Sequence, residues 1–252
     1  MDFDDKYFEH MAEFEEKIWN AFEGLDFRNC RLKIEPKDFL VDGLIEKSSI
    51  VIFYGPPKSA KSLLMVDLMV SLVDRESWLS RKISAPASVR YCAFEDSDSF
   101  KLRAVCSYQY KLTKKTNSEK PVGYCEFATK PPNIFEPLFE RALEDEHLSY
   151  EAVRDPEEPG PPRVLIIDTL ALAMSGFGDE NSSATMGKVV DKLRRIRDLG
   201  TTVIVVHHSG KDLSKGLRGH NSLEAAADSI FSVQKKPNSN LVKLKRTHYR
   251  NG

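Results

Sequence analysis

Residues 50–62, IVIFYGPPKSAKS, decide the fold of this 252-residue chain. An apolar, β-prone run leads into a glycine–proline turn, and a lysine–serine pair then opens a helical pattern. Proteins hold the phosphates of a nucleoside triphosphate with this order of strand, small-residue loop, lysine and hydroxyl, because backbone N–H groups of the loop face the phosphates. The stretch therefore predicts a nucleotide-binding loop made of Gly55, Pro56, Pro57, Lys58, Ser59, Ala60, Lys61 and Ser62.

Two side chains of this loop carry the predicted chemistry. Lys61 is expected to reach the β- and γ-phosphate oxygens, and the Ser62 hydroxyl is expected to hold Mg²⁺. The usual pattern, Gly-x-x-x-x-Gly-Lys-Ser, has a second glycine where this chain has Ala60. Because an alanine needs a backbone conformation that tolerates a Cβ, we expect the loop to sit slightly differently around the phosphates.

The composition is that of an ordinary globular protein, with 41% hydrophobic and 30% charged residues. A net charge of −1 gives no global attraction to nucleic acid, so any such binding must come from a local basic surface. The four cysteines form no CxxC pair and no zinc pattern, which is typical of reduced, buried thiols. With no signal peptide and no apolar run of membrane-spanning length, the sequence predicts a soluble, cytoplasmic protein without a membrane partner.

Apolar, strand-like runs alternate with helical patterns along the chain. The expected strands are residues 49–54, 88–94, 122–127, 163–167 and 202–206, followed by the less apolar 229–233 and 241–249, which suggest an antiparallel extension. The expected helices are residues 61–73, 135–146, 184–199 and 223–228. This alternation predicts an α/β fold with a mainly parallel central sheet flanked by helices.

A helical pattern also opens the chain, over residues 5–23. Its apolar positions recur at helical spacing: Phe8, Met11, Phe14, Ile18 and Phe22. We therefore predict an N-terminal amphipathic helix and linker in residues 1–38, before a main domain of residues 39–252. The helix either packs on its own core or docks on an adjacent subunit.

Acidic residues follow two of the predicted strands. Asp168 ends the strand at 163–167, at the edge where parallel sheets bind their ligands, so it is placed to support Mg²⁺ beside Ser62. Glu95 and Asp96 end the strand at 88–94, where a carboxylate can orient and deprotonate a water that attacks the γ-phosphate. The alternative for Glu95 and Asp96 is a solvated acidic strand end.

Two later motifs offer further polar groups. The strand VIVV runs directly into His207 and His208, one of which could contact the γ-phosphate; the alternatives are a hydrogen-bonded strand-end histidine or a metal ligand pair. In KGLRGHNSLEAAAD, the glycine-flanked Arg218 suits an arginine finger that completes a neighbouring subunit's site. The alternative for Arg218 is simple solvent exposure.

The motifs GPPKSAKS, AFEDS, VLIIDTLA, VVHHSGKD and LRGHNSLEAAAD stand in an order that resembles the RecA-like ATPases of the RepA-type hexameric replicative helicases, which are related to DnaB-type helicases. The resemblance implies a RecA-like P-loop NTPase fold for residues 39–252. It also implies ATP and Mg²⁺ as ligands, and a homohexamer or other ring that hydrolyses ATP to translocate on single-stranded DNA.

The resemblance further implies individual roles. Glu95 would be the catalytic base, His207 the γ-phosphate sensor and Arg218 a finger acting in trans, while Ser62 and Asp168 would support Mg²⁺. Arg246 and Arg250 compete with Arg218 for the finger role.

In RecA-like rings the loops corresponding to residues 171–185 and 209–221 point into the central channel. The second carries Lys211 and Lys215, which suit a phosphate backbone. The alternative is a pair of solvated loops. A further cluster of cations in residues 188–197 is most simply the solvated outer face of a helix. At the level of function, the alternative is a RecA-like DNA-binding ATPase that loads, anneals or regulates without unwinding.

Overall fold

The computed structural model describes residues 37–95, 97–113, 123–139, 141–143, 160–210, 221–236 and 238–250. Asp38–Gly252 form one compact unit. The predicted helix at residues 5–23 lies outside the described residues, and the predicted domain boundary at residue 38 stays a prediction.

A seven-stranded sheet of order β5-β4-β6-β7-β3-β8-β9 forms the centre of the unit. All neighbouring strands pair in parallel except β8 and β9, which are antiparallel. The middle strands are apolar almost throughout because helices cover both faces of the sheet. The strands are β3 (Ile50–Gly55), β4 (Ser88–Ala93), β5 (Tyr124–Ala128), β6 (Arg163–Asp168), β7 (Thr201–His208), β8 (Ser229–Lys235) and β9 (Val242–Tyr249). This arrangement confirms the predicted α/β fold with a mainly parallel sheet.

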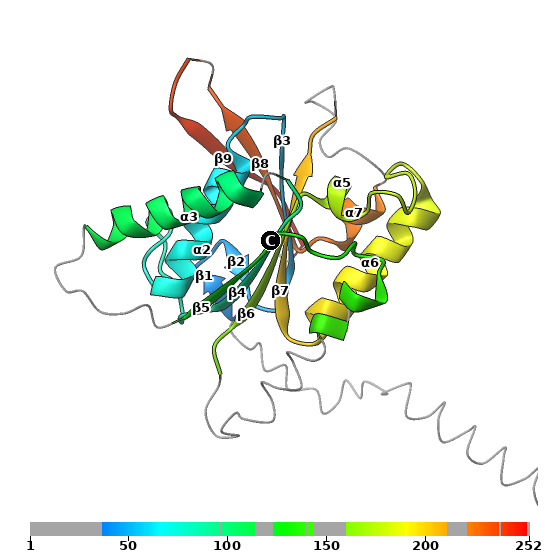
Figure 1. Ribbon diagram of the computed structural model, residues 1–252, viewed down its shortest axis with the longest axis horizontal. Coiled ribbons are helices and arrows are strands. Elements are labelled where there is room, and N and C mark those ends of the chain that lie inside the picture. Colours follow the sequence, from blue (N-terminus) through cyan, green and yellow to red (C-terminus); the bar gives the residue numbers. More distant parts are fainter. Residues whose placement is uncertain are drawn as a thin grey trace, which may run out of the picture. The chain divides into compact units, whose positions relative to one another are not determined.

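Helices lie on both faces of the sheet (Figure 1). One face carries α2 (Lys61–Asp74) and α3 (Ser97–Leu112), and the other carries α5 (Leu170–Ala173), α6 (Ser183–Asp198) and α7 (Ser222–Ala226). Residues 137–139 and 141–143 are also helical, within the range predicted for a helix at 135–146. None of the helices in the described ranges is long and apolar enough to cross a membrane.

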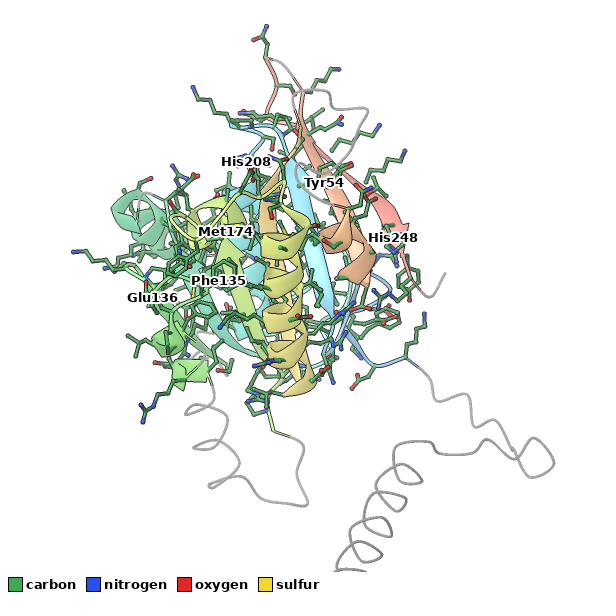
Figure 2. All side chains as sticks on the ribbon, turned by 90° about the vertical axis from the view of Figure 1, so that its right-hand side faces the viewer. Tyr54, Phe135, Glu136, Met174, His208 and His248 are labelled. Atoms are coloured by element: carbon green, nitrogen blue, oxygen red, sulfur yellow. The ribbon has the colours of Figure 1, made fainter. Side chains whose placement is uncertain are left out.

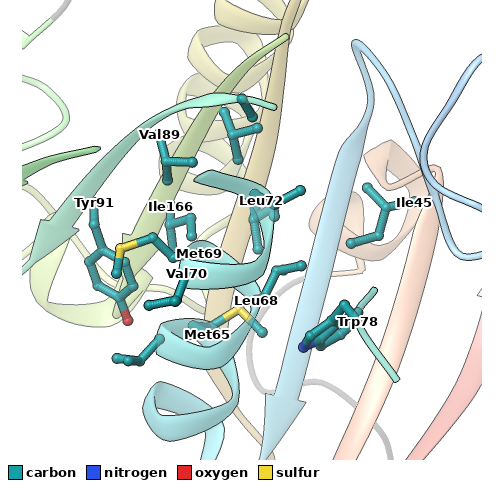
Figure 3. Close-up of a cluster of buried hydrophobic side chains, with 14 of the residues drawn as sticks. Ile45, Met65, Leu68, Met69, Val70, Leu72, Trp78, Val89, Tyr91 and Ile166 are labelled. Atoms are coloured by element: carbon teal, nitrogen blue, oxygen red, sulfur yellow. The ribbon is translucent and has the colours of Figure 1, made fainter. Parts of the chain in front are cut away.

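Each face of the sheet has its own hydrophobic core. On the α2 face, Leu68 and Leu72 pack towards Val89 and Ile166 of the sheet (Figure 3). Side chains alternate along a strand, and β7 shows this clearly. Its even-numbered residues Ile204 and Val206 belong to the α2-face core, whereas the odd-numbered Val203 and Val205 belong to the α6-face core.

Three parts of the fold differ from the prediction. Helix α3 was not expected, because only Phe100 and Ala104 are buried among its described residues and the apolar period is weak. A small two-stranded sheet of β1 (Phe39–Val41) and β2 (Ile45–Glu46) was also missed, since strands this short leave no periodic signal. The antiparallel extension begins one strand later than expected, at β9, because β8 pairs in parallel with β3.

Candidate functional site

The phosphate-binding loop joins the carboxyl end of β3 to the start of α2. Lys58 and Ala60 adopt left-handed backbone conformations, with φ angles of 61° and 69°. Ala60 therefore takes the conformation that favours glycine, and the expected shift of the loop around the phosphates stays a prediction. Holding an alanine there costs about 1–2 kcal/mol.

Gly55 lies at the first glycine position of the loop motif. A Cβ added to Gly55 would overlap the carbonyl oxygen of Val233 in β8. Glycine is therefore required at this position by close backbone approach rather than by its φ angle. As a result, the start of the loop is packed directly against strand β8.

Lys61 lies inside the loop with only 6% of its surface exposed. Its ammonium group donates hydrogen bonds of 2.9 Å to the carbonyl oxygens of Gly55 and Pro56. Burial lowers the pKa of Lys61, while the carboxylates of Asp168 and Glu95 act in the opposite direction. Since an ammonium group has three protons, one remains for a phosphate oxygen.

Asp168 ends β6 next to this lysine and is only 4% exposed. The buried hydroxyl of Tyr91 on β4 donates a 2.6 Å hydrogen bond to its Oδ2 atom. Burial raises the pKa of Asp168, and hydrogen bonding from Tyr91 and Ser62 partly offsets this rise. Burial, followed by the charge of Asp168, raises the pKa of Tyr91 well above its usual range, so Tyr91 stays a hydrogen-bond donor.

Several buried oxygens at this edge lack a partner within the described parts of the chain. They are Ser59 Oγ, Asp168 Oδ1 and Thr169 Oγ1, for which no hydrogen bond of standard geometry is present. A buried polar atom left in this state costs about 1–3 kcal/mol. A phosphate and a hydrated cation would supply the missing partners, so these groups fit such a ligand.

The oxygen atoms at this edge of the sheet fit Mg²⁺ better than a metal ion that is held by protein side chains alone. No group of three or more His, Cys, Asp or Glu side chains is arranged to hold a metal ion in the described ranges. Mg²⁺ prefers oxygen ligands and commonly takes one or two from the protein and the rest from water and phosphates. Ser62 and Asp168 offer such oxygens beside the loop.

A cavity of about 600 Å³ opens above the loop. Its lining comes from the loop and from the ends of other elements: Pro57, Lys58, Ser59, Ala60, Lys61, Ser62, Leu63, Glu95, Arg103, Thr169 and His208. Glu95 Oε1 lies 3.9 Å from His208 Nε2, and the Glu95 side chain is 53% exposed. The cavity thus brings together a phosphate-binding loop, the accessible carboxylate of Glu95 and the side chains of Arg103 and His208.

A family profile for the AAA domain matches residues 19–214. The chain belongs to the AAA domain family. No curated protein matches its sequence. Among solved structures, one ATPase domain has a TM-score of 0.60 at 12% identity, covering 97% of this chain and 91% of that chain. The flagellar accessory protein FlaH from Methanocaldococcus jannaschii has a TM-score of 0.48 at 14% identity, covering 81% and 79%. The match to the solved ATPase domain and the sheet order confirm the predicted RecA-like P-loop fold.

In this AAA domain the histidine beside the cavity is His208, not the predicted His207. His207 is fully buried, in phase along β7 with Val203 and Val205 of the α6-face core. His208 points to the other face, which is the face of α2 and the loop, and Figure 2 shows it at the end of the sheet near Tyr54. Two adjacent strand residues cannot face the same site, and the sequence does not state which one does.

Arg103 of the AAA domain was missed by sequence reasoning. It lies on α3 and lines the cavity from the same chain. Its charge is close enough to Tyr91 to oppose the rise in the pKa of that phenol. No motif marked Arg103, and the weak periodicity of α3 hid the helix that places it.

Of the remaining predicted residues, Arg218, Lys211 and Lys215 lie outside the described residues. Arg246 and Arg250 are described and do not line the cavity. Arg246 donates a 2.6 Å hydrogen bond to the Gly43 carbonyl and lies 4.7 Å from the Tyr249 ring centroid. Arg250 donates to the Ala225 carbonyl at 2.6 Å and lies 3.4 Å from Asp228. Both candidate fingers on or just after β9 therefore have contacts within their own chain.

Proposed function

We propose that this chain is an ATP-dependent DNA helicase of RepA type. It hydrolyses ATP at the subunit interfaces of a homo-oligomeric ring, hexameric or of another size, and translocates on single-stranded DNA. One observation carries the proposal: a single cavity unites Lys61 and Ser62 of the loop with Glu95, which follows β4, and His208, which ends β7.

ATP is held first by the loop. Backbone N–H groups and the free proton of Lys61 bind its phosphates, and the Ser62 hydroxyl and the Asp168 carboxylate hold Mg²⁺. Mg²⁺, when bound, neutralises the charge that develops on the phosphates. Tyr91 supports this arrangement because its hydrogen bond to Oδ2 fixes the Asp168 carboxylate, while Oδ1 has no hydrogen bond of standard geometry with the described residues.

Glu95 is the proposed catalytic base. Its exposed carboxylate lines the cavity, where it can accept a proton from the water that attacks the γ-phosphate. His208, 3.9 Å from Glu95, takes the sensor role first assigned to His207. Loss of the γ-phosphate would change the contact between Glu95 and His208. Because His208 ends β7, this change would reach the segment that follows the strand.

The ring and the DNA contacts are proposed from the order of the motifs. Arg218 completes a neighbour's site, because Arg246 and Arg250 are engaged within their own chain. Lys211 and Lys215 contact the DNA backbone, a role for which lysine suits as a sequence-independent cation.

A second candidate is a RecA-like DNA-binding ATPase that loads, anneals or regulates without unwinding. Ala60 is the observation that favours it, since its left-handed conformation with φ of 69° strains the loop that must hold the phosphates. Negligible turnover with intact DNA binding would support this candidate.

The test is the ATPase rate with and without single-stranded DNA, with the mass in solution and the displacement of a paired strand measured on the same samples. In a Glu95→Gln variant, we expect ATP binding to persist while turnover falls by about 10²–10⁴, the usual contribution of a general base. Glu224→Gln, which changes an exposed carboxylate on α7, is the matched control and should leave turnover unchanged. Unchanged hydrolysis in Glu95→Gln would remove Glu95 from the mechanism.

A further inference from the structure

The last 24 residues of the chain differ sharply in charge from the rest. Residues 229–252 contain six lysines and arginines and no aspartate or glutamate, although the whole chain has a net charge of −1. Arg246 and Arg250 make the intrachain contacts described above. The four lysines of this segment are exposed, and none forms an ion pair with another described residue: Lys235, Lys236, Lys243 and Lys245.

Three of these lysines, Lys235, Lys236 and Lys243, lie at the tip of the β8–β9 hairpin, which we define as residues 234–236 and 241–243, and Lys245 follows the tip on β9. The pairing of Lys235 with Val242 closes the described ladder. Lys235 lies on the same face as Val233, whereas Lys243 and Lys245 lie on the opposite face, because side chains alternate along each strand. The hairpin tip therefore presents cations on both faces of a narrow ribbon.

The hairpin tip projects from the edge of the sheet that carries the phosphate loop. Strand β8 runs parallel to β3 with Tyr54 paired to Ser232, so Lys235 lies three residues, or about 10 Å, beyond that level. Figure 1 shows the hairpin reaching past the rest of the sheet. Strand β7, the other neighbour of β3, ends at the same edge, and Lys211 and Lys215 follow it in the sequence.

We propose that the hairpin tip is a contact for the phosphate backbone of single-stranded DNA, additional to Lys211 and Lys215. The proposal rests on the DNA-binding function proposed above. Exposed ammonium groups without an ion-pair partner bind phosphates at little desolvation cost and release counterions from the strand. A flexible single strand can follow a narrow ribbon and contact the cations on both of its faces. A ligand that binds to one flat surface would need cations on one face only.

The apolar side chains of the hairpin tip suit the same ligand. Leu241 is 68% exposed, and Val242 is also exposed. With Gln234 and the lysines they line a hollow of about 560 Å³. Bases can pack on such a surface without base-specific hydrogen bonds, so we expect binding without sequence preference.

The test measures the affinity of the full chain for a fluorescent thymidine oligonucleotide over a range of salt concentrations. The variant changes Lys235, Lys236 and Lys243 together to alanine. For single strands the slope of log affinity against log salt changes by about 0.7 for each phosphate contact, so the slope should become shallower by up to about 2. The difference in affinity should be largest at low salt.

Two matched variants separate a local contact from net charge. Changing Lys188, Arg194 and Arg195 on the exposed face of α6 to alanine removes the same charge and should leave the slope unchanged. Changing the three hairpin lysines to arginine keeps the charge and should retain the wild-type slope.

Three results would overturn the hairpin proposal, and they differ in what they imply for DNA binding. Equal slopes for the hairpin and α6 variants would overturn the hairpin proposal while leaving the DNA-binding function intact. No binding by the wild type would overturn both. Loss of the oligomer in the hairpin variant, with no change in the slope of the remaining complex, would place the lysines at a subunit contact and also overturn the proposal.

Discussion

The carboxylate of Asp168 is buried at the end of β6, where Tyr91 donates its one hydrogen bond of standard geometry within the described chain. Its folded-state pKa is raised above the unfolded value of about 3.9, chiefly by burial. A raised carboxyl pKa contributes stability that is fully present below the unfolded pKa and is lost as pH rises through the folded pKa. At neutral pH, therefore, the ionised side chain destabilises the fold.

We accordingly expect Asp168→Asn to be more stable than the wild type at pH 7, by about 2–4 °C in Tm for each kcal/mol gained. The advantage should shrink as pH falls through the raised pKa and vanish near pH 4, where the wild-type carboxyl is also neutral. Thermal unfolding across this pH range, without nucleotide, is the measurement. A pH-independent advantage would contradict the assigned cause.

Tyr91→Phe is the companion variant, and it should destabilise the protein because it leaves the carboxylate without this donor.

Ala60 gives a second prediction for a single residue. Glycine adopts its φ of 69° without strain, so Ala60→Gly should raise the free energy of unfolding by up to about 1 kcal/mol after the entropy cost of a glycine is subtracted. The matched control is Ala225→Gly in helix α7, which should lower it by about 0.5–1 kcal/mol. Chemical denaturation measures both. An equal loss in the two variants would mean that residue 60 gains nothing from glycine.

At the scale of elements, the strands and helices with strong periodicity were predictable, and the weakly patterned ones were not. Strand β3 and helix α6 were located to within a residue or two, because a fully apolar run and an amphipathic repeat are local signals. Helix α3 depends on tertiary contacts of Phe100 and Ala104, which the sequence alone does not reveal. Without that helix, nothing in the sequence drew attention to Arg103.

One cysteine on the edge strand β5 and one on helix α3 differ in exposure, and their labelling rates test whether this edge of the sheet opens. Burial raises the pKa of Cys125 on β5 to about 12, whereas Cys106 on α3 is exposed. At pH 8 only about one part in ten thousand of Cys125 is thiolate, which is the reactive form. We expect iodoacetamide to modify Cys106 at least about tenfold faster than Cys125, as followed by peptide mass spectrometry. After denaturation the two rates should converge, and fast labelling of Cys125 in the native state would show that β5 opens.

The location of the site was predictable at the scale of the whole molecule, because the carboxyl ends of parallel strands meet at one edge. That rule brought Lys61, Asp168 and Glu95 together from sequence positions far apart, close enough for both carboxylates to act on the pKa of the lysine. It could not choose between His207 and His208, since the choice depends on which face of β7 each residue takes. It could not find Tyr91 either, because a tyrosine within an apolar strand looks like any other core residue.

Assembly gives the prediction at this scale. Arg218→Ala should lower ATP turnover by about 10³ or more while sparing nucleotide binding, as expected for an arginine finger. Mixing it with Lys61→Ala should restore part of the activity, because hybrid interfaces then combine an intact loop with an intact finger. The ATPase rate of the mixture, compared with each variant alone, is the readout. Absence of rescue would exclude a finger acting in trans. The Arg246→Ala variant should mainly lower Tm, because it loses the hydrogen bond to the Gly43 carbonyl.

The close contact between Gly55 and strand β8 has a consequence for how this protein can evolve. At residue 60 the motif's glycine has been replaced at a torsional cost that one side chain can bear. At residue 55 any replacement would meet the backbone of Val233, and relief would require moving a whole strand. Substitutions in the loop are therefore tolerated at its second glycine position, residue 60, and excluded at its first, residue 55. A search for divergent relatives should hold residue 55 fixed and let residue 60 vary.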